Sequence, residues 1–131
     1  MSDRKQQLEQ ISESFLDAFN RNDLDGVMSF FTDDIVYDEL DGTRSEGLAA
    51  VRAAFAPQFD GKFGQMTFVE DDTFIDADSG KIMSSWDLKI SKDDGTTLVL
   101  RGLDLLQFRG DKICLKQTYV KAKSALYQAE G

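Results

Sequence analysis

The spacing of apolar residues changes once along this chain, near residue 60, and this change constrains the fold more than any other feature of the sequence. Up to that point apolar side chains recur mainly at three- and four-residue steps, as they do along one side of a helix. Beyond it they recur at every second residue, as they do on one face of a β-strand. The sequence therefore predicts helices followed by an antiparallel sheet, an α+β arrangement.

The part before residue 60 is expected to contain three helices and one short strand. The first helix ends near residues 20–22. Its apolar face consists of Leu8, Ile11, Phe15, Ala18 and Phe19. Asp23 is a suitable N-cap for a second, shorter helix. Residues 35–37 form the short strand, and Ser45 is expected to cap a third helix that Pro57 ends.

Four strands are expected after residue 64, because turn-forming Gly and Asp residues divide this part of the chain. The expected strands cover residues 66–75, 82–90, 97–109 and 112–121. In the first of them the alternation is broken around residues 70–72, which indicates a β-bulge. Since there are no repeats, linkers or low-complexity tracts, residues 1–131 are expected to form a single domain.

Composition excludes several classes of function. The chain has 24 Asp and Glu residues against 15 Lys and Arg residues, and this net charge of −9 would repel a nucleic acid. It contains no histidine, so neither a Ser-His-Asp triad nor an imidazole zinc site can form. No motif for a phosphate-binding loop or a calcium loop is convincing, so we expect no metal and no cofactor.

The location of the protein is also constrained by the sequence. No apolar run approaches the roughly 18 residues that a membrane-spanning helix needs, and polar residues follow Met1 where a secretion signal would be apolar. The single cysteine, Cys114, excludes an intramolecular disulfide. These features predict a cytoplasmic protein that does not bind membranes.

Asp104 lies in an apolar row of the strand expected over residues 97–109. The residues that share its face are Leu98, Leu100, Gly102, Leu106 and Phe108. If this face points at the helices, burial favours the neutral carboxyl, which can donate a hydrogen bond inside an apolar cavity. Alternatively, Asp104 accepts a hydrogen bond from a backbone amide or pairs with an Arg or Lys.

Asp38 follows the apolar strand 35–37, at a position where a carboxylate can reach a cavity. The nearby acids Glu39 and Asp41 would favour its protonation by like-charge repulsion, which suits a general base. A solvated acid in a turn is the alternative. Because two carboxyl groups in different environments can divide acid and base roles, Asp38 and Asp104 are the catalytic candidates.

Long stretches of the chain resemble the NTF2-like superfamily, in particular its ketosteroid isomerase-like and SnoaL-like branch. The stretches that carry this resemblance are residues 15–27, 30–38, 47–55, 102–108 and 110–113. The resemblance implies a cone in which three N-terminal helices pack in a curved antiparallel sheet around a pocket. This superfamily contains isomerases, cyclases, dehydratases, epoxide hydrolases and non-catalytic adaptors, so the fold alone does not specify the activity.

The resemblance also implies roles for single residues. Asp38 falls at the position of the isomerase's general base, and Asp104 at that of the protonated Asp in its oxyanion hole. The family's oxyanion tyrosine corresponds to Phe15, and losing one such donor typically reduces the rate on the order of a hundred- to a thousandfold. The candidate replacement donors are Tyr37, Tyr119 and the indole of Trp86.

These roles predict a small-molecule pocket protein, a cofactor-independent acid–base enzyme that acts on a hydrophobic carbonyl substrate as an isomerase or a cyclase. Two alternatives stay open. One is a non-catalytic dimer module that binds a ligand or a protein, and the other is a hydrolase resembling limonene-epoxide hydrolase, in which an Arg helps to orient water. The residues expected to line the pocket are Phe15, Phe19, Phe55, Trp86, Leu106 and Phe108.

The other face of the strand over residues 97–109 carries Val99, Leu103 and Leu105. This face is too apolar to be left in water. We therefore expect a homodimer that forms through the sheet, as is common in the superfamily that the chain resembles.

Overall fold

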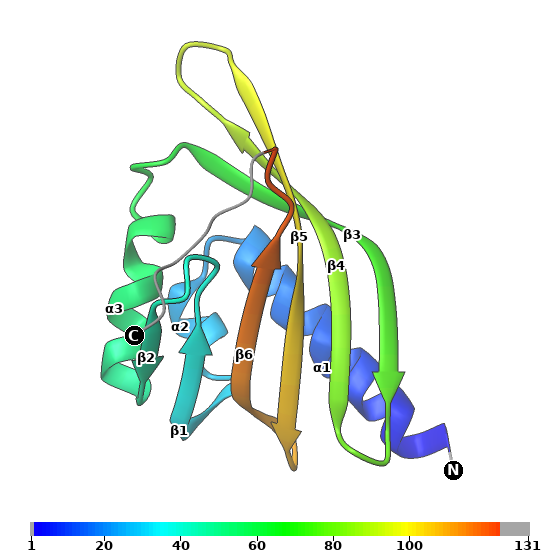
Figure 1. Ribbon diagram of the computed structural model, residues 1–131. Coiled ribbons are helices and arrows are strands. Elements are labelled where there is room, and N and C mark those ends of the chain that lie inside the picture. The colour runs from blue at the N-terminus through cyan, green and yellow to red at the C-terminus, as the bar shows by residue number, and fades with distance from the viewer. Residues whose placement is uncertain (1, 124–131) are drawn as a thin grey trace.

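A computed structural model describes residues 2–123, and in this range three helices pack against one curved sheet of six strands (Figure 1). This arrangement confirms the predicted α+β fold. The helices are α1 (Ser2–Asn20), α2 (Leu24–Met28) and α3 (Leu48–Phe59). The strands are β1 (Phe31–Asp38), β2 (Arg44–Glu46), β3 (Gln65–Asp76), β4 (Lys81–Ser91), β5 (Thr97–Arg109) and β6 (Lys112–Val120).

The strand order is β2-β1-β6-β5-β4-β3, and the sheet is mixed. Neighbouring strands are antiparallel except β1 and β6, which run parallel, so the expectation of an antiparallel sheet needs this correction. The reason lies in the connections. Hairpins connect β3 to β4, β4 to β5 and β5 to β6. Strand β6 then pairs with β1, and because no hairpin connects these two strands, they can run parallel. As a result, β6 lies in the middle of the sheet, between β1 and β5.

Helix α1 forms where the sequence predicts it, and its apolar side is buried. Leu8, Phe15 and Ala18 recur at helical spacing and are almost inaccessible to solvent. Asp23 caps α2 as expected, because its Oδ1 accepts a hydrogen bond from the backbone N–H of Gly26 at 2.9 Å.

Both ends of α3 differ from the expectation. Ser45 does not cap this helix, because it lies in β2, opposite Tyr37 of β1. The N-cap is Gly47, whose φ of +89° is a backbone conformation that favours glycine. Pro57 lies inside α3, and the helix ends two residues later at Phe59. A proline near the end removes one backbone donor without preventing a last partial turn.

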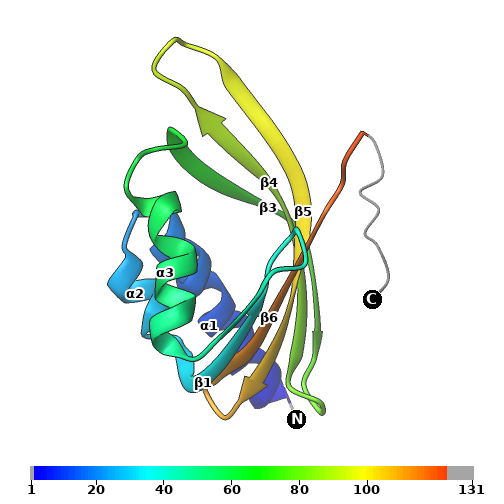
Figure 2. The same cartoon turned by 60° about the vertical axis from the view of Figure 1, so that its left-hand side comes forward.

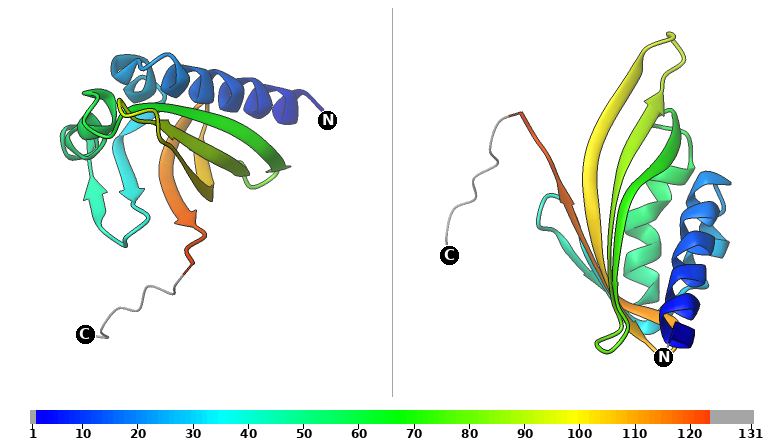
Figure 3. Two further views of the ribbon diagram at one scale, coloured as in Figure 1. Left: turned by 90° about the horizontal axis from the view of Figure 1, so that it is seen from above. Right: turned by 90° about the vertical axis from the view of Figure 1, so that its right-hand side faces the viewer.

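The helices cover one face of the sheet and leave the other uncovered (Figures 2 and 3). Along β4 the buried side chains alternate with more exposed ones, and the buried set is Ile82, Ser84, Trp86 and Leu88. The expected bulge of β3 is confirmed, because its register with β4 shifts between Glu70 and Asp72. None of the helices within residues 2–123 is long and apolar enough to cross a membrane.

Candidate functional site

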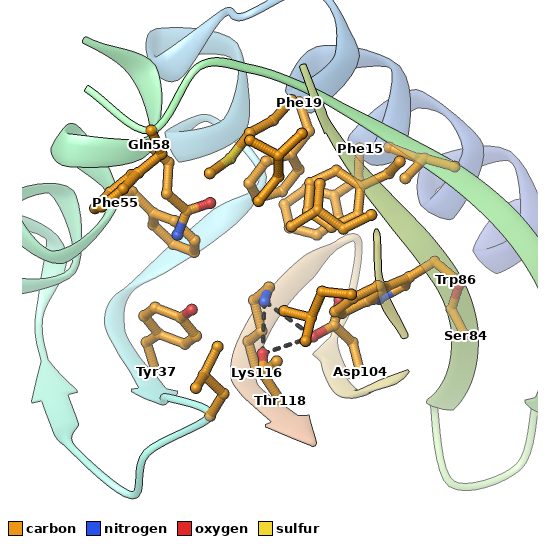
Figure 4. A pocket seen from close by; sticks show the side chains of 18 of the residues that line it. Phe15, Phe19, Tyr37, Phe55, Gln58, Ser84, Trp86, Asp104, Lys116 and Thr118 are labelled. Carbon is orange, nitrogen blue, oxygen red and sulfur yellow. Dashed lines mark hydrogen bonds and ion pairs between the residues drawn. The ribbon is translucent and has the colours of Figure 1, made fainter. Parts of the chain in front are cut away.

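A pocket of about 340 Å³ opens between α1, α3 and the covered face of the sheet (Figure 4). Its walls are mainly aromatic and aliphatic, and the ring of Phe19 contacts those of Phe15 and Phe55 edge to face. Five of the six residues that the sequence predicts for the pocket line it: Phe15, Phe19, Phe55, Trp86 and Leu106.

Phe108 is the exception among these residues. Its side chain is buried, but it belongs to the core and does not line the pocket. Phe108 lies at the end of β5, opposite Ile113 of β6, where the register of the two strands shifts. Both side chains are therefore used to fill the core beside the pocket.

Asp104 extends from β5 into the pocket wall and accepts three hydrogen bonds (Figure 4). Nε1 of Trp86 donates to its Oδ2 at 3.1 Å. Nζ of Lys116 and Oγ1 of Thr118 donate to its Oδ1 at 2.9 Å and 2.6 Å. Lys116 also donates to Oγ1 of Thr118 at 2.8 Å. We refer to these four residues as the Asp104 cluster.

Asp104 accepts hydrogen bonds in the structure, whereas the neutral carboxyl expected from the sequence would donate one. Its carboxyl group forms an ion pair with Lys116, and the two side chains are only 13% and 6% exposed. Of the two arrangements that the sequence allows for Asp104, the structure has the pairing with a basic residue.

Lys116 keeps its positive charge in this apolar environment. Burial alone would lower the pKa of its ammonium group, but attraction to the Asp104 carboxylate, followed by the effect of Tyr37 and the hydrogen bond to Asp104, outweighs burial. The pKa of Lys116 is consequently raised above its ordinary value of 10.5. Nζ also lies 4.7 Å from the centre of the Tyr37 ring and 5.5 Å from that of Phe55.

The register of the sheet brings the Asp104 cluster together. Asp104 lies directly between Ser84 of β4 and Thr118 of β6. Lys116 is opposite Leu106, two residues along β5 from Asp104, so the long lysine side chain reaches the carboxylate diagonally.

Gly102 gives the indole of Trp86 the space to reach Asp104. These two residues face each other across β4 and β5. A Cβ atom at position 102 would lie 2.7 Å from Cη2 of Trp86 and 2.5 Å from the carbonyl oxygen of Tyr119. A side chain at this position would therefore displace either the indole or the neighbouring strand.

Sequence reasoning missed Lys116 and Thr118 because a bulge changes the alternation of β6. Strict alternation from Ile113 would place Lys116 on the opposite face. In the structure, Gln107 and Phe108 are adjacent in β5, whereas their partners in β6, Leu115 and Ile113, are two residues apart. Cys114 is the extra residue, so Ile113 and Lys116 both point to the covered face.

Asp38 does not line this pocket. It follows the buried Tyr37 in β1, so its side chain lies on the uncovered face of the sheet, where Nε2 of Gln117 is 3.5 Å from its Oδ2. The structure thus places the two carboxyl candidates, Asp38 and Asp104, on opposite faces. They cannot act together on one ligand in the pocket.

The three candidate replacement donors have different positions. Tyr119 is half exposed and lies away from the pocket. The N–H of Trp86 is already bonded to Asp104. Tyr37 lines the pocket, and its hydroxyl forms no hydrogen bond within residues 2–123.

Two further types of site are disfavoured by the residues present. No arginine lines the pocket within the described part of the chain, and Arg101, Arg52 and Arg44 form ion pairs with Asp87, Asp25 and Glu46 elsewhere. Within residues 2–123, no three His, Cys, Asp or Glu side chains are grouped so that they could hold a metal ion.

Comparison with protein families gives one match. The model of the SnoaL-like domain matches residues 12–115. A candidate polyketide cyclase from Xanthomonas campestris pv. campestris is similar in structure, with a TM-score of 0.74, 21% identity and coverage of 89% of this chain and 92% of that one. No curated protein matches the sequence significantly.

Two further solved structures have the same fold. The epoxide hydrolase/cyclase-like enzyme SalBIII, described for pyran ring formation in the polyether salinomycin, has a TM-score of 0.79 at 17% identity, with coverage of 92% of this chain and 95% of that chain. A Mycobacterium tuberculosis protein solved with estradiol-17β-hemisuccinate has a TM-score of 0.72 at 20% identity, with coverage of 86% and 92%. At these identities the likeness concerns the fold.

Proposed function

Because this chain belongs to the SnoaL-like domain family, we propose that its pocket binds a small, largely apolar molecule with a carbonyl group and moves a proton on that molecule. One observation carries the proposal: the ion pair of Asp104 and Lys116 is buried in the wall of a pocket that is otherwise mainly aromatic and aliphatic. Removing two charged groups from water costs free energy, so a buried ion pair in a pocket wall needs an explanation other than stability. Apolar pockets with a few convergent polar groups are typical of small-molecule sites.

The size and lining of the pocket support this class of ligand. A volume of about 340 Å³ lies within the usual range for small-molecule sites. Flat rings on several sides favour a molecule with one or two rings. Among the lining residues, the buried charged groups are those of Asp104 and Lys116, so the ligand's polar group would be placed beside them.

Asp104 is the group that we assign to proton transfer. Its Oδ2 accepts one hydrogen bond, from Trp86, and a carboxylate oxygen can accept two. The remaining position can take a proton from a carbon atom next to a carbonyl group. Such a transfer, followed by return of the proton to another atom, is the chemistry of an isomerase or a cyclase.

A binding module without chemistry is the second candidate, and a specific observation favours it. Phe15 offers no hydrogen-bond donor to the pocket, and Asp38 lies on the other face of the sheet. The hydrolase has less support, because no arginine within the described residues lines the pocket.

The test uses the ketone 2-acetylnaphthalene as a probe. The chain has one tryptophan, so the indole N–H of Trp86 gives a single, unambiguous NMR signal at the pocket. We expect this signal to shift saturably with the ketone. In D₂O we expect the acetyl protons of the ketone to exchange faster with the protein than with buffer, and Asp104→Asn to abolish this acceleration. No shift would refute the ligand proposal, and a shift without accelerated exchange would establish the binding module.

We also propose that the uncovered face of the sheet forms a homodimer. Phe74 is 67%, Tyr119 51% and Leu105 38% exposed on this face, beside the half-buried Leu103. Val99, also expected there, is exposed further along β5. An apolar surface of this kind is typical of a contact between copies of one chain.

Sedimentation at micromolar concentration tests the dimer. We expect a dimer for the natural chain and a monomer for Leu105→Glu, which places a charge at the centre of the face. The control for association is Leu40→Glu, which adds the same charge at an exposed leucine that lines the pocket and lies outside this face. A monomeric natural chain would contradict the proposal. The cytoplasmic location stays a prediction from the sequence.

A further inference from the structure

We propose that Lys116 binds the carbonyl oxygen of the ligand and serves as the counter-ion first of Asp104 and then of the enolate that forms from the ligand. This inference rests on the proposed function and deepens it, because it names the class of ligand: an uncharged ketone. Neither the sequence patterns nor the family match assigns a role to this lysine.

The hydrogen bonds of Lys116 leave room for one more acceptor. An ammonium group has three N–H donors. Nζ donates to Oδ1 of Asp104 and to Oγ1 of Thr118, and within the described residues no third oxygen or nitrogen accepts from it. Its other neighbours are the ring faces of Tyr37 and Phe55, which are weaker partners than an oxygen atom. Figure 4 shows Nζ at the wall of the pocket, between these rings and Asp104.

Other donors in the pocket are weaker candidates for the same role. The single N–H of Trp86 is bonded to Asp104, and Phe15 has none. Tyr37, Ser84 and Gln58 line the pocket but are neutral. Lys92 also lines it and is charged, but it is exposed to solvent just after the end of β4. A hydrogen bond from a charged donor is roughly twice as strong as one between neutral groups, so an ammonium group kept charged by Asp104 dominates.

The charge of the pair selects an uncharged ligand. Asp104 and Lys116 together are neutral, and both are nearly inaccessible to solvent. A carboxylate or phosphate at the cluster would add a second buried negative charge beside Asp104, and the cluster has no second cation to balance it. Lys92, which also lines the pocket, is exposed to solvent and is not part of the cluster. A ketone oxygen accepts the hydrogen bond without adding charge.

Lys116 also lowers the electrostatic cost of the proton transfer. When the C–H bond next to the carbonyl breaks, the proton forms an O–H bond with Asp104, and the electron pair moves to the carbonyl oxygen. The negative charge thus passes from Asp104 to the enolate oxygen, and both are neighbours of Lys116. The total charge of the site does not change, and the ammonium group stabilises each anion in turn. Return of the proton from Asp104 restores the original pair.

Two probes of nearly equal shape test this inference. They are 2-acetylnaphthalene and 2-ethylnaphthalene, which differ by the carbonyl oxygen, and their binding is followed at the Trp86 indole signal. We expect the natural chain to bind the ketone roughly tenfold more tightly than the hydrocarbon. Lys116→Met should reduce this preference to about twofold or less and abolish the exchange of the acetyl protons.

Because Lys116→Met alone leaves the Asp104 charge uncompensated and can fail to fold, the double variant Asp104→Asn/Lys116→Met is measured with it. The double variant has no buried charge, so we expect it to fold, to bind both probes and to show no preference. A matched control is Asp87→Asn, which removes a carboxylate of β4 outside the pocket and should keep the preference.

The outcomes separate this inference from the proposed function. If neither probe shifts the Trp86 signal of the natural chain, the ligand proposal fails. If both probes bind equally well, the pocket function stands and the role of Lys116 is refuted. A ketone preference that persists in the double variant would equally contradict Lys116 as the donor, and would assign it to a neutral group such as the Tyr37 hydroxyl.

Discussion

Removing one partner of the buried ion pair should destabilise the protein more than removing both. Lys116→Met leaves the Asp104 carboxylate with the neutral donors Trp86 and Thr118 and no cation in contact. Because the two side chains are only 6% and 13% exposed, solvent cannot replace the lost charge. Breaking such a pair typically costs about 3 to 5 kcal/mol.

The double variant Asp104→Asn/Lys116→Met has no charge to leave unpaired, so we expect it to be at least about 1 kcal/mol more stable than Lys116→Met. Urea unfolding of the natural chain, both single variants and the double variant, followed by Trp86 fluorescence and circular dichroism, gives the coupling energy. If the two single effects add to the double effect within about 0.5 kcal/mol, the pair is not coupled and the reasoning is wrong.

Four further outcomes are expected. Gly102→Ala should lower the unfolding free energy by about 1 to 3 kcal/mol and shift the Trp86 indole signal, because its Cβ would overlap the indole; an unchanged signal would contradict this. The pKa of Lys116 is raised on folding, so its contribution to stability is complete below pH 10.5 and is lost as pH rises above the raised value; alkaline unfolding of the natural chain and the double variant checks this. Burial, followed by repulsion from a neighbouring acid, raises the pKa of Glu39 above its ordinary 4.5, so Glu39→Gln should raise the melting temperature at neutral pH and have no effect well below pH 4.5. Asp38→Asn should leave ketone exchange unchanged, and a loss of exchange would reinstate Asp38 as the base.

The positions of the main helices and strands could be predicted because their causes are local. Apolar spacing defines α1, a side-chain cap begins α2, and alternation with glycine turns defines β4 and β5. The parallel pairing of β1 and β6 depends on a contact between segments far apart in the chain. No local pattern encodes this pairing, so the sequence alone predicts an antiparallel sheet.

In the site, too, the residues placed by a regular local pattern could be predicted, and those placed by an irregularity could not. Alternation along β5 is regular, so Asp104 and Leu106 could be placed on the covered face from the sequence. The bulge at Cys114 shifts the alternation of β6, and with it Lys116, onto that face. For Asp38, the sequence predicts a carboxylate that reaches a cavity because it follows the apolar strand 35–37. In the structure Asp38 still belongs to β1, and alternation from the buried Tyr37 points its side chain to the uncovered face.

The central claim is that Lys116 donates a hydrogen bond to a carbonyl group bound in the pocket, and infrared spectroscopy tests it most directly. The probe is 2-acetylnaphthalene labelled with ¹³C at the carbonyl carbon, which separates its stretching band from those of the protein. A hydrogen bond from an ammonium group weakens the carbonyl bond. We predict that the band of the ketone bound to the natural chain lies at lower frequency than the band of the ketone bound to Asp104→Asn/Lys116→Met. Equal frequencies in the two proteins, close to that of the ketone in an apolar solvent, would contradict the account.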